Sequence, residues 1–309
     1  MPDATHTSPA PDGNISLFRA ILGVSRAPFL LLPLTLIAAG AAASAYEGEF
    51  SWLATILATI GLVAMHIAVD VFNEASDMRT GIDLHTTRTP FSGGSGTLPA
   101  GAMSVRGAYI WGAIAAAIGA GIGIWFLFQV GWPLVPILIL GALAVGAYSD
   151  FFGRIGIGEI VAGLGLGTLP ILGASLVQDG HIGPAAIAAS IPGFLMTFNL
   201  LLLNEFPDVQ ADRAGGRRHL IILFGRRAAA RIYLLAVALV PVSIIVAVII
   251  GALPRLTLIA AAPTLLTLPA WRWAPRAESE RLPIPAQGAN VAWNLLTNVL
   301  LAVALILAA

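Results

Sequence analysis

Long stretches without Asp, Glu, Arg or Lys constrain the fold of this sequence more than any other feature. Most are close to or above the roughly 20 residues that a helix needs to cross the hydrocarbon core of a bilayer. Inside that core every backbone polar group has to be paired within the protein, so such stretches favour membrane-spanning helices. The charge-free stretches are 27–46, 50–69, 107–149, 160–178, 182–204, 232–254, 256–271 and 282–309.

Two of these stretches decide the number of spans. The stretch 107–149 is too long for one crossing, and we expect it to fold back at 129–132, which brings the predicted number to about nine. The stretch 256–271 is the shortest and contains Pro263 and Pro269, so we expect this eighth span to be tilted, kinked or partly re-entrant. The predicted fold is all-α, a polytopic membrane protein.

Composition supports a membrane protein and excludes several classes. Hydrophobic residues make up 58% of the chain and charged residues 10%, whereas about 25% charged residues is usual in soluble domains. Without cysteine, disulfides and thiolate metal sites are impossible. A formal net charge of zero gives no basic face for nucleic acid, so we expect the lipid bilayer and no nucleic-acid partner. One transmembrane domain, 17–309, is expected to follow a disordered cytoplasmic tail, 1–16.

The arginines predict the orientation. Lysine is absent, so all 16 basic side chains are arginines. With nine spans, every arginine except Arg255 falls on the side of the amino terminus. The positive-inside rule then places the amino terminus in the cytoplasm. We therefore expect a protein integral to the cell (inner) membrane.

A short acidic motif occurs twice. The pattern NExxD stands at 73–77 and again at 204–208, each time after an even-numbered predicted span. Such spacing indicates an internal duplication, so the bundle is expected to consist of two four-helix repeats plus one helix. The two motifs are then expected to meet across the interface between the repeats, on the cytoplasmic side.

The motif residues offer oxygen ligands for a metal ion. Helical spacing places Asn73 and Asp77 on one face, and Asn204, Asp208 and Asp212 four residues apart on a second helix. Carboxylates near a membrane boundary need a compensating cation or a wet cavity. Mg²⁺ prefers oxygen ligands and is commonly held by carboxylates together with substrate phosphate. We therefore predict a Mg²⁺ site here, with Asp77 and Asp208 as its catalytic centre.

Arginines next to both motifs favour a diphosphate ligand. Arg79 and Arg88 adjoin the first motif and the segment 89–96, TPFSGGSG, whose backbone amides are expected to form an anion-binding nest. Arg217 and Arg218 follow the second motif. Guanidinium groups bind phosphate oxygens in pairs, so these residues are predicted to bind diphosphate. The alternative interpretation is a plain flexible turn with arginines that only set the topology.

With these residues the chain resembles the UbiA superfamily of intramembrane prenyltransferases. Asp208 and Asp212 match its DxxxD pair. The first motif resembles the variant of the dihydroxynaphthoate prenyltransferases of menaquinone synthesis. That similarity rests on Asn73, Asp77, Gly81, Asp83 and Arg88. The resemblance implies a bundle of nine spans around a central cavity, two Mg²⁺ ions with Asp83 among their ligands, and a polyprenyl tail in a groove open to lipid.

One residue departs from the family's pattern. Glu74 stands where aspartate is usual, which leaves open whether Glu74 and the nearby Asp70 are metal ligands. Tyr148 and Arg154 lie on the link between the fourth and fifth predicted spans, where similar proteins have polar residues near the diphosphate or acceptor. Their alternative roles are an interfacial aromatic anchor and a topology-setting arginine.

The resemblance implies transfer of a polyprenyl group from its diphosphate to an aromatic acceptor. The motif variant favours 1,4-dihydroxy-2-naphthoate, while 4-hydroxybenzoate, homogentisate, a tetrapyrrole or a lipid remain open as acceptors. A cation-coupled transporter is the rival from another class, because duplicated intramembrane acids also occur there.

Overall fold

The computed structural model describes residues 16–309 of the chain. All regular elements in this range are helices, which confirms the predicted all-α class. The predicted tail, 1–16, lies outside the described residues except for Ser16, whose hydroxyl caps α1 (Leu17–Val24) by accepting from the Arg19 amide.

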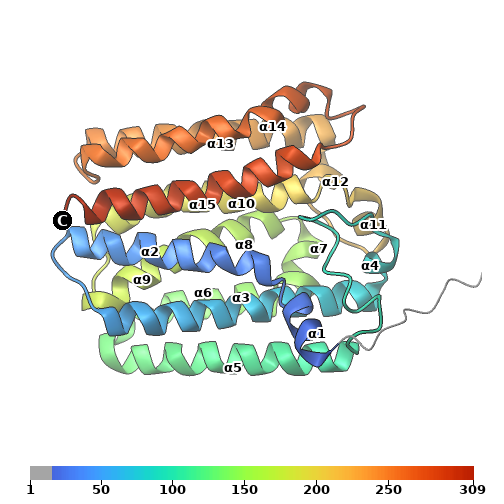
Figure 1. Ribbon diagram of the computed structural model, residues 1–309, viewed down its shortest axis with the longest axis horizontal. Helices are drawn as coiled ribbons and strands as arrows, with labels where there is room; N and C mark the ends of the chain where they lie inside the picture. Colours follow the sequence, from blue (N-terminus) through green and yellow to red (C-terminus); the bar gives the residue numbers. More distant parts are fainter. Residues whose placement is uncertain (1–15) are drawn as a thin grey trace, which may run out of the picture.

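Long helices run side by side along the longest axis of the molecule (Figure 1). Short elements gather at one end of this bundle, which we call the motif end, and the carboxyl terminus lies at the other. The long elements are α2 (Leu31–Tyr46), α3 (Trp52–Thr80), α5 (Val105–Val130), α6 (Val135–Gly146), α8 (Gly158–Gly163) continued through a π-helical turn by α9 (Leu169–Asp179), α10 (Pro184–Asn204), α13 (Arg226–Ile249) and α15 (Ile284–Ile306). The short elements at the motif end include α1, α4 (Ile82–His85), α7 (Gly153–Ile155), α11 (Val209–Ala214) and α12 (Leu220–Phe224).

Seven described helices are long and apolar enough to cross a membrane, and eight if one bent pair forms a single span. That pair is Trp132–Gly146 with Tyr148–Ile155, bent by 65°. The predicted fold-back of 107–149 is confirmed, because α5 ends at Val130 and Gly131 turns the chain with a φ of +76°. The stretch 256–271 forms a 3₁₀ helix, Arg255–Thr267, followed by α14 (Leu268–Trp273). It is not among the described helices that are long and apolar enough to cross a membrane. The number nine therefore stays a prediction.

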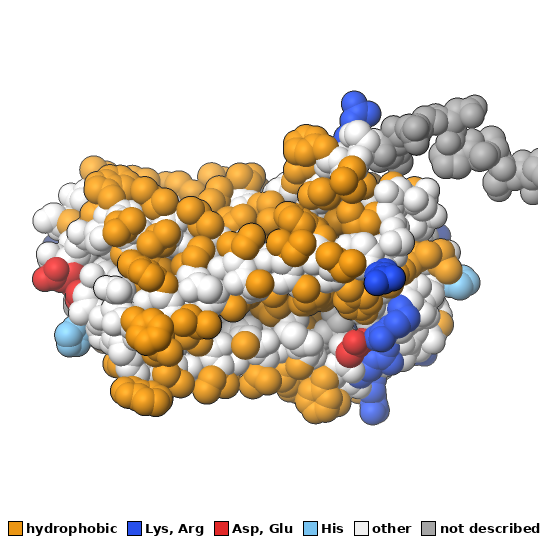
Figure 2. Space-filling view, turned by 90° about the horizontal axis from the view of Figure 1, so that it is seen from below, with side chains coloured by type: hydrophobic (Ala, Val, Ile, Leu, Met, Phe, Trp, Pro, Cys, Tyr) orange, Lys and Arg blue, Asp and Glu red, His pale blue; other side chains and the backbone are white. Residues whose placement is uncertain are grey.

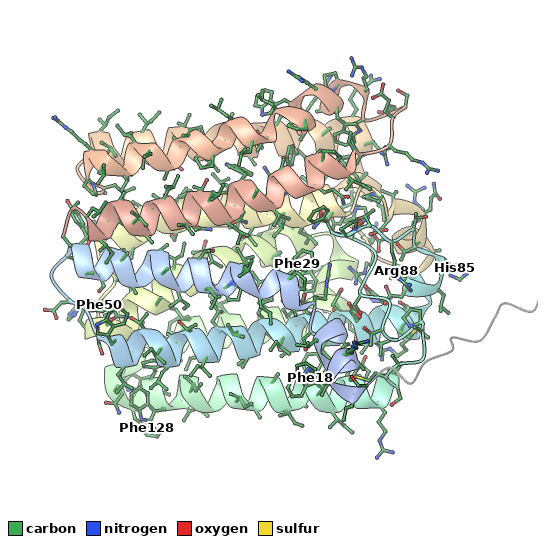
Figure 3. The ribbon with its side chains drawn as sticks, viewed as in Figure 1. Phe18, Phe29, Phe50, His85, Arg88 and Phe128 are labelled. Carbon is green, nitrogen blue, oxygen red and sulfur yellow. The ribbon has the colours of Figure 1, made fainter. Side chains whose placement is uncertain are left out.

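Hydrophobic and charged side chains occupy separate zones of the surface. Figure 2 shows hydrophobic side chains over the middle of one face and charged side chains near its two ends. Arg88 and His85 lie at the motif end, whereas Phe50 and Phe128 lie at the opposite end (Figure 3). A soluble protein rarely exposes so continuous an apolar zone. The protein is integral to a membrane, with both ends of the bundle facing water.

Helix α3 carries the first motif as an unbroken helix. Its N-cap is Ser51, whose hydroxyl accepts from the Ala54 amide at 3.3 Å, and its C-cap is Gly81, which has a φ of +80°. The helix thus continues well past the end of the charge-free stretch. Its last turns carry Asn73 and Asp77 to the motif end.

The second motif differs from the expected continuous helix. Helix α10 ends at Asn204, a turn follows, and α11 starts after Asp208. Pro207 interrupts the helix because it lacks a backbone N–H and its ring clashes with the preceding turn. Asp208 and Asp212 therefore lie on a separate short helix, not on one column with Asn204.

Candidate active site

Each acidic motif contacts the segment that follows the other one. Asp77, in the first motif, accepts a hydrogen bond from the Arg217 guanidinium, which follows the second. Asp208, in the second motif, accepts a hydrogen bond from the Thr86 hydroxyl, which follows the first. These crossed contacts bring the two motifs together at the motif end.

Arg217 joins the acidic residues of this site. Its Nε lies 3.7 Å from Oδ1 of Asp212, and its backbone amide donates to the Asp212 carbonyl at 2.8 Å. The side chain is only 12% exposed. Burial lowers the pKa of Arg217, but the carboxylates of Asp77 and Asp212 outweigh burial and raise it. The guanidinium is therefore a fixed positive charge among the acids.

A glycine-rich turn covers the first motif. Gly93, Gly94 and Gly96 all have a positive φ, which side-chain-bearing residues rarely adopt. A Cβ atom on Gly94 would lie 2.8 Å from Oδ1 of Asp83, so only glycine lets the backbone approach this buried carboxylate. The turn thus encloses Asp83.

Ser95, within this turn, is bound to Glu74. Its amide and its hydroxyl donate to the two Glu74 carboxylate oxygens at 2.6 and 2.5 Å. The Ser95 amide, expected to be part of an anion-binding nest, is therefore occupied by a carboxylate. Both oxygens of Glu74 are likewise engaged by protein groups.

The carboxyl groups of Asp83 and Asp208, both outside the membrane spans, have raised pKa values. Burial raises the pKa of Asp83 to about 7, and the neighbouring charges of Asp77 and Glu74 add to the effect. Burial also raises the pKa of Asp208 to about 6, although the Thr86 hydrogen bond works against the shift. Such crowding of acids is relieved by protons or by a cation.

The other predicted arginines occupy different places. Arg79 donates to both oxygens of Asp150, at 2.7 and 2.8 Å, and is half exposed. Arg88 packs its guanidinium against Gly96 and donates to the Asp83 carbonyl at 3.4 Å. Arg154 lies beside Gly216 and Arg218 is exposed. Among the predicted arginines, Arg217 is the one that the structure places between the motif carboxylates.

The two motif asparagines each form one side-chain hydrogen bond with another polar side chain. The Asn73 amide donates to the Ser149 hydroxyl at 3.2 Å, and the Asn204 amide oxygen accepts from Gln287 at 3.3 Å. Both asparagines line the same cavity.

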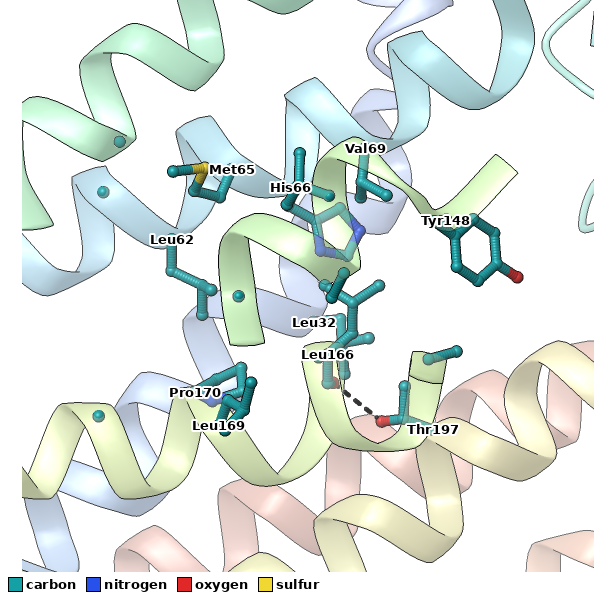
Figure 4. A pocket seen from close by; sticks show the side chains of 18 of the residues that line it. Leu32, Leu62, Met65, His66, Val69, Tyr148, Leu166, Leu169, Pro170 and Thr197 are labelled. Carbon is teal, nitrogen blue, oxygen red and sulfur yellow. Dashed lines mark hydrogen bonds between the residues drawn. The ribbon is translucent and has the colours of Figure 1, made fainter. Parts of the chain in front are cut away.

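That cavity extends from the site into the bundle. Its volume is about 300 Å³. It begins beside Asn73, Asn204 and Arg217 and continues along an apolar wall to Phe126 and Val177. Figure 4 shows Tyr148 and His66 among its lining side chains. A ligand with a charged head and a long apolar tail would fit a cavity that is polar at one end and apolar along the rest of its length.

The sequence predicts only a topological role for Arg26, yet this arginine lines the cavity. It is the only non-glycine residue with a positive φ in the described part of the chain, 47°. Its guanidinium lies 4.6 Å from the centre of the Phe29 ring and donates to the Phe91 carbonyl at 3.5 Å. Its position directly before the first apolar stretch was the available signal, because an arginine there is either interfacial or functional.

A second buried group, of two acids and one histidine, is not predicted from the sequence. Glu159, Glu205 and His219 are buried, and one ligand atom of each lies within 4.8 Å of the others, a set that could hold a metal ion. His219 also lies 3.5 Å from Asp212. Burial and the charge of Glu159 raise the pKa of Glu205. Glu205 belongs to the repeated motif, but nothing in the sequence links it to Glu159.

Known proteins resemble large parts of this chain. The chain is 25% identical over 198 residues to the 1,4-dihydroxy-2-naphthoate octaprenyltransferase of Bacillus subtilis, a match that covers 61% of this chain but only 60% of that protein. It is 29% identical over 150 residues to the digeranylgeranylglyceryl phosphate synthase of Pyrococcus furiosus, covering 43% of this chain and 46% of the relative.

A solved structure shares the fold. The UbiA homologue from Archaeoglobus fulgidus bound to GPP and Mg²⁺ superimposes with a TM-score of 0.67 at 15% identity, over 93% of this chain and 99% of that one. A profile of the UbiA prenyltransferase family matches residues 31–296. The chain therefore belongs to the UbiA prenyltransferase family.

Proposed function

We propose that the protein is a Mg²⁺-dependent membrane prenyltransferase that moves a polyprenyl group from its diphosphate to 1,4-dihydroxy-2-naphthoate. The observation that carries this proposal is the crossed pairing of Asp77 with Arg217 and of Asp208 with Thr86, next to an apolar cavity that Arg217 itself lines. The cavity supplies room for a prenyl tail, and the paired motifs supply the charges that bind its head.

The oxygen-rich motif end fits a magnesium-bound diphosphate. Oδ2 of Asp83 is buried without a hydrogen-bond partner in the described chain, and the pKa values of Asp83 and Asp208 are raised, so a cation would relieve the crowding. Magnesium prefers such ligands over nitrogen or sulfur. The residues proposed to hold it are Asn73, Asp77, Asp83, Asn204, Asp208 and Asp212.

The chain's own residues would position the diphosphate for departure. Bound Mg²⁺ would supply neutralisation of the charge that develops as the allylic C–O bond breaks. Arg217, held between Asp77 and Asp212, is assigned to the diphosphate oxygens as a second, fixed positive charge. Arg79, Arg88, Arg154 and Arg218 are assigned outer positions around the diphosphate. Tyr148 lines the cavity and is assigned to the acceptor.

The preference for a naphthoate acceptor rests on the motif variant around Asp77 and Asp83 and on the name of the Bacillus relative. The Pyrococcus relative is named for a lipid product, so a glycerol phosphate acceptor is the competing assignment. The proposed location is the inner membrane, with the motif end facing the cytoplasm, because the arginines concentrate on that side.

One experiment tests this assignment. Membranes containing the protein are incubated with Mg²⁺, a labelled polyprenyl diphosphate and, separately, 1,4-dihydroxy-2-naphthoate, 4-hydroxybenzoate, homogentisate or a glycerol phosphate lipid. The expected product is the prenylated naphthoate-derived ring, identified by mass, and only when Mg²⁺ is present. Uptake of a substrate into vesicles without any prenylated product would instead support a transporter.

A further inference from the structure

A histidine and an aspartate that belong to neither motif lie in the cavity wall. His66 and Asp70 are one turn apart on α3, and Nε2 of His66 lies 3.6 Å from Oδ2 of Asp70. Both side chains line the cavity, and Figure 4 shows the His66 imidazole between Met65 and Val69 of the same helix. They form a carboxylate–imidazole pair within a membrane span.

This pair is not satisfied by the protein. The His66 and Asp70 side chains are 4% and 16% exposed, yet Nδ1 of His66 and Oδ2 of Asp70 have no hydrogen-bond partner within residues 16–309. Leaving such groups unpaired is costly, because their desolvation is not compensated by a hydrogen bond. Ionisable residues inside a membrane usually face a cavity that a ligand or water fills. Both unpartnered atoms are covered by neighbouring protein atoms, so a ligand in the cavity would reach the pair through its exposed part, chiefly on Asp70.

Asp70 and His66 lie at the depth in the cavity where the allylic carbon of a bound prenyl diphosphate is expected. Asp70 precedes Asn73 by three residues, about 4.5 Å along the helix, and Asn73 marks the diphosphate end of the cavity. The allylic carbon is bonded directly to the diphosphate, so it lies just inside this end. Near His66 the wall includes the apolar side chains of Leu62, Met65 and Leu166, and Arg26 lines the same cavity. A flat aromatic ring with a hydroxyl group facing the pair matches both features.

We propose that Asp70 and His66 form the acceptor site, binding the hydroxyl group of a hydroxyarene and removing its proton during transfer. This inference rests on the proposed prenyltransferase function and deepens it. In the step, the acceptor O–H bond breaks and its proton passes to the pair. Its electron pair forms a ring C=O, the ring carbon bonds to the allylic carbon, and the C–O bond breaks with its electrons leaving on the diphosphate.

The arrangement of the pair suits a general base. A carboxylate beside an imidazole orients the ring and stabilises the positive charge that the ring gains with a proton. Proton removal of this kind contributes about 10²- to 10⁴-fold to a rate. An ionised hydroxyarene is also a stronger carbon nucleophile, so the contribution falls on the bond-forming step.

The test compares Asp70→Asn and His66→Gln with the wild-type protein in membranes. Two properties are measured: Mg²⁺-dependent binding of labelled polyprenyl diphosphate, and transfer to a series of hydroxyarenes of increasing hydroxyl acidity. Thr59→Val is the matched control, because Thr59 is on the same helix and its hydroxyl donates to the Thr55 carbonyl at 2.7 Å. This control is expected to bind and transfer as the wild type does.

The expected result is unchanged diphosphate binding, a loss of transfer of about 10²-fold in both variants, and partial recovery with the most acidic acceptors, which need no base. Transfer within twofold of wild type overturns the inference. So does an equal loss for all acceptors, or a parallel loss of diphosphate binding, since either outcome would indicate a structural role. If the wild type itself transfers nothing to any hydroxyarene, the proposed function fails first, and this inference fails with it.

Discussion

The Arg217 guanidinium donates to the Asp77 carboxylate across 140 residues of sequence, and it joins the two halves of the site. The same arginine lies 3.7 Å from Asp212, so it links the last turn of α3 to α11. Since Arg217 also lines the cavity, one side chain connects both acidic motifs to the space beneath them.

Replacing this arginine is expected to abolish turnover. Arg217→Met leaves Asp77 and Asp212 buried without their cation, and Arg217→Lys keeps the charge but not the paired guanidinium hydrogen bonds. We expect kcat/KM to fall by at least about 10²-fold in Arg217→Met and less in Arg217→Lys. Arg213→Met is the control, because Arg213 is exposed on the same short helix. Equal activities in all three variants would contradict the role of Arg217.

Magnesium affinity is expected to depend on pH. The carboxyl groups of Asp83 and Asp208 have pKa values of about 7 and about 6, and a metal ion binds only their ionised forms. Affinity should therefore fall as the pH drops from about 8 to about 5.5. Titration of the detergent-solubilised protein with Mn²⁺, followed by electron paramagnetic resonance, measures this. An affinity that is constant over that interval would contradict a site built on these acids.

The same shifts predict how stability changes without metal. An acid whose pKa is raised by folding stabilises the folded state fully below its ordinary value, and this contribution is lost as the pH rises through the raised value. The metal-free protein should lose stability between about pH 4 and pH 7, and Mg²⁺ should restore it at the upper end. Thermal unfolding with and without Mg²⁺ across this interval tests the sign.

The turn over Asp83 offers a matched pair of glycine substitutions. Gly94 and Gly101 have nearly equal φ angles, +70° and +71°, so alanine strains the backbone equally at both, by about 1–2 kcal/mol. Only at Gly94 would the new Cβ meet Asp83, whereas nothing lies within 4 Å at Gly101. Gly94→Ala should therefore weaken Mn²⁺ binding at least tenfold, and Gly101→Ala should not. Equal effects would indicate that backbone strain alone matters.

Orientation can be measured without a background signal, because the chain contains no cysteine. Thr87 is exposed at the motif end, and Glu49 is exposed in the turn between α2 and α3 at the other end. In intact cells, Thr87→Cys is expected to be protected from a membrane-impermeant thiol reagent and Glu49→Cys to react. The reverse pattern would place the motif end outside.

Much of the fold could be predicted from charge alone. The long helices and the fold-back before Trp132 were predictable because the length of each charge-free stretch is a local property of the sequence. That length can be compared directly with the hydrophobic thickness of a bilayer. The predicted span over 256–271 was harder, because Pro263 breaks the hydrogen-bonding pattern and leaves a 3₁₀ helix. The length and hydropathy of such a segment do not decide whether it crosses the membrane.

The repetition of the acidic motif was the main signal for the site in the sequence. The repeated NExxD pattern led to Asp77 and Asp208, but the segment 86–104 reaches both motifs through contacts that no local rule gives, such as Ser95 with Glu74. The Glu159–His219 group depends on three-dimensional proximity alone, and the one signal for Arg26 was its position before the first apolar stretch. The break after Asn204 could have been foreseen from Pro207.

The central claim is that the two motifs hold one metal-bound diphosphate. The measurement that tests it most directly is Mg²⁺-dependent binding of a labelled polyprenyl diphosphate to Asp77→Ala, Asp208→Ala and the double variant, all in membranes that contain equal amounts of protein. If both aspartates serve one site, each single variant should lose at least about 10²-fold in affinity, and the double variant should lose little more. Wild-type affinity in either single variant, or losses that simply multiply in the double variant, would contradict a shared site.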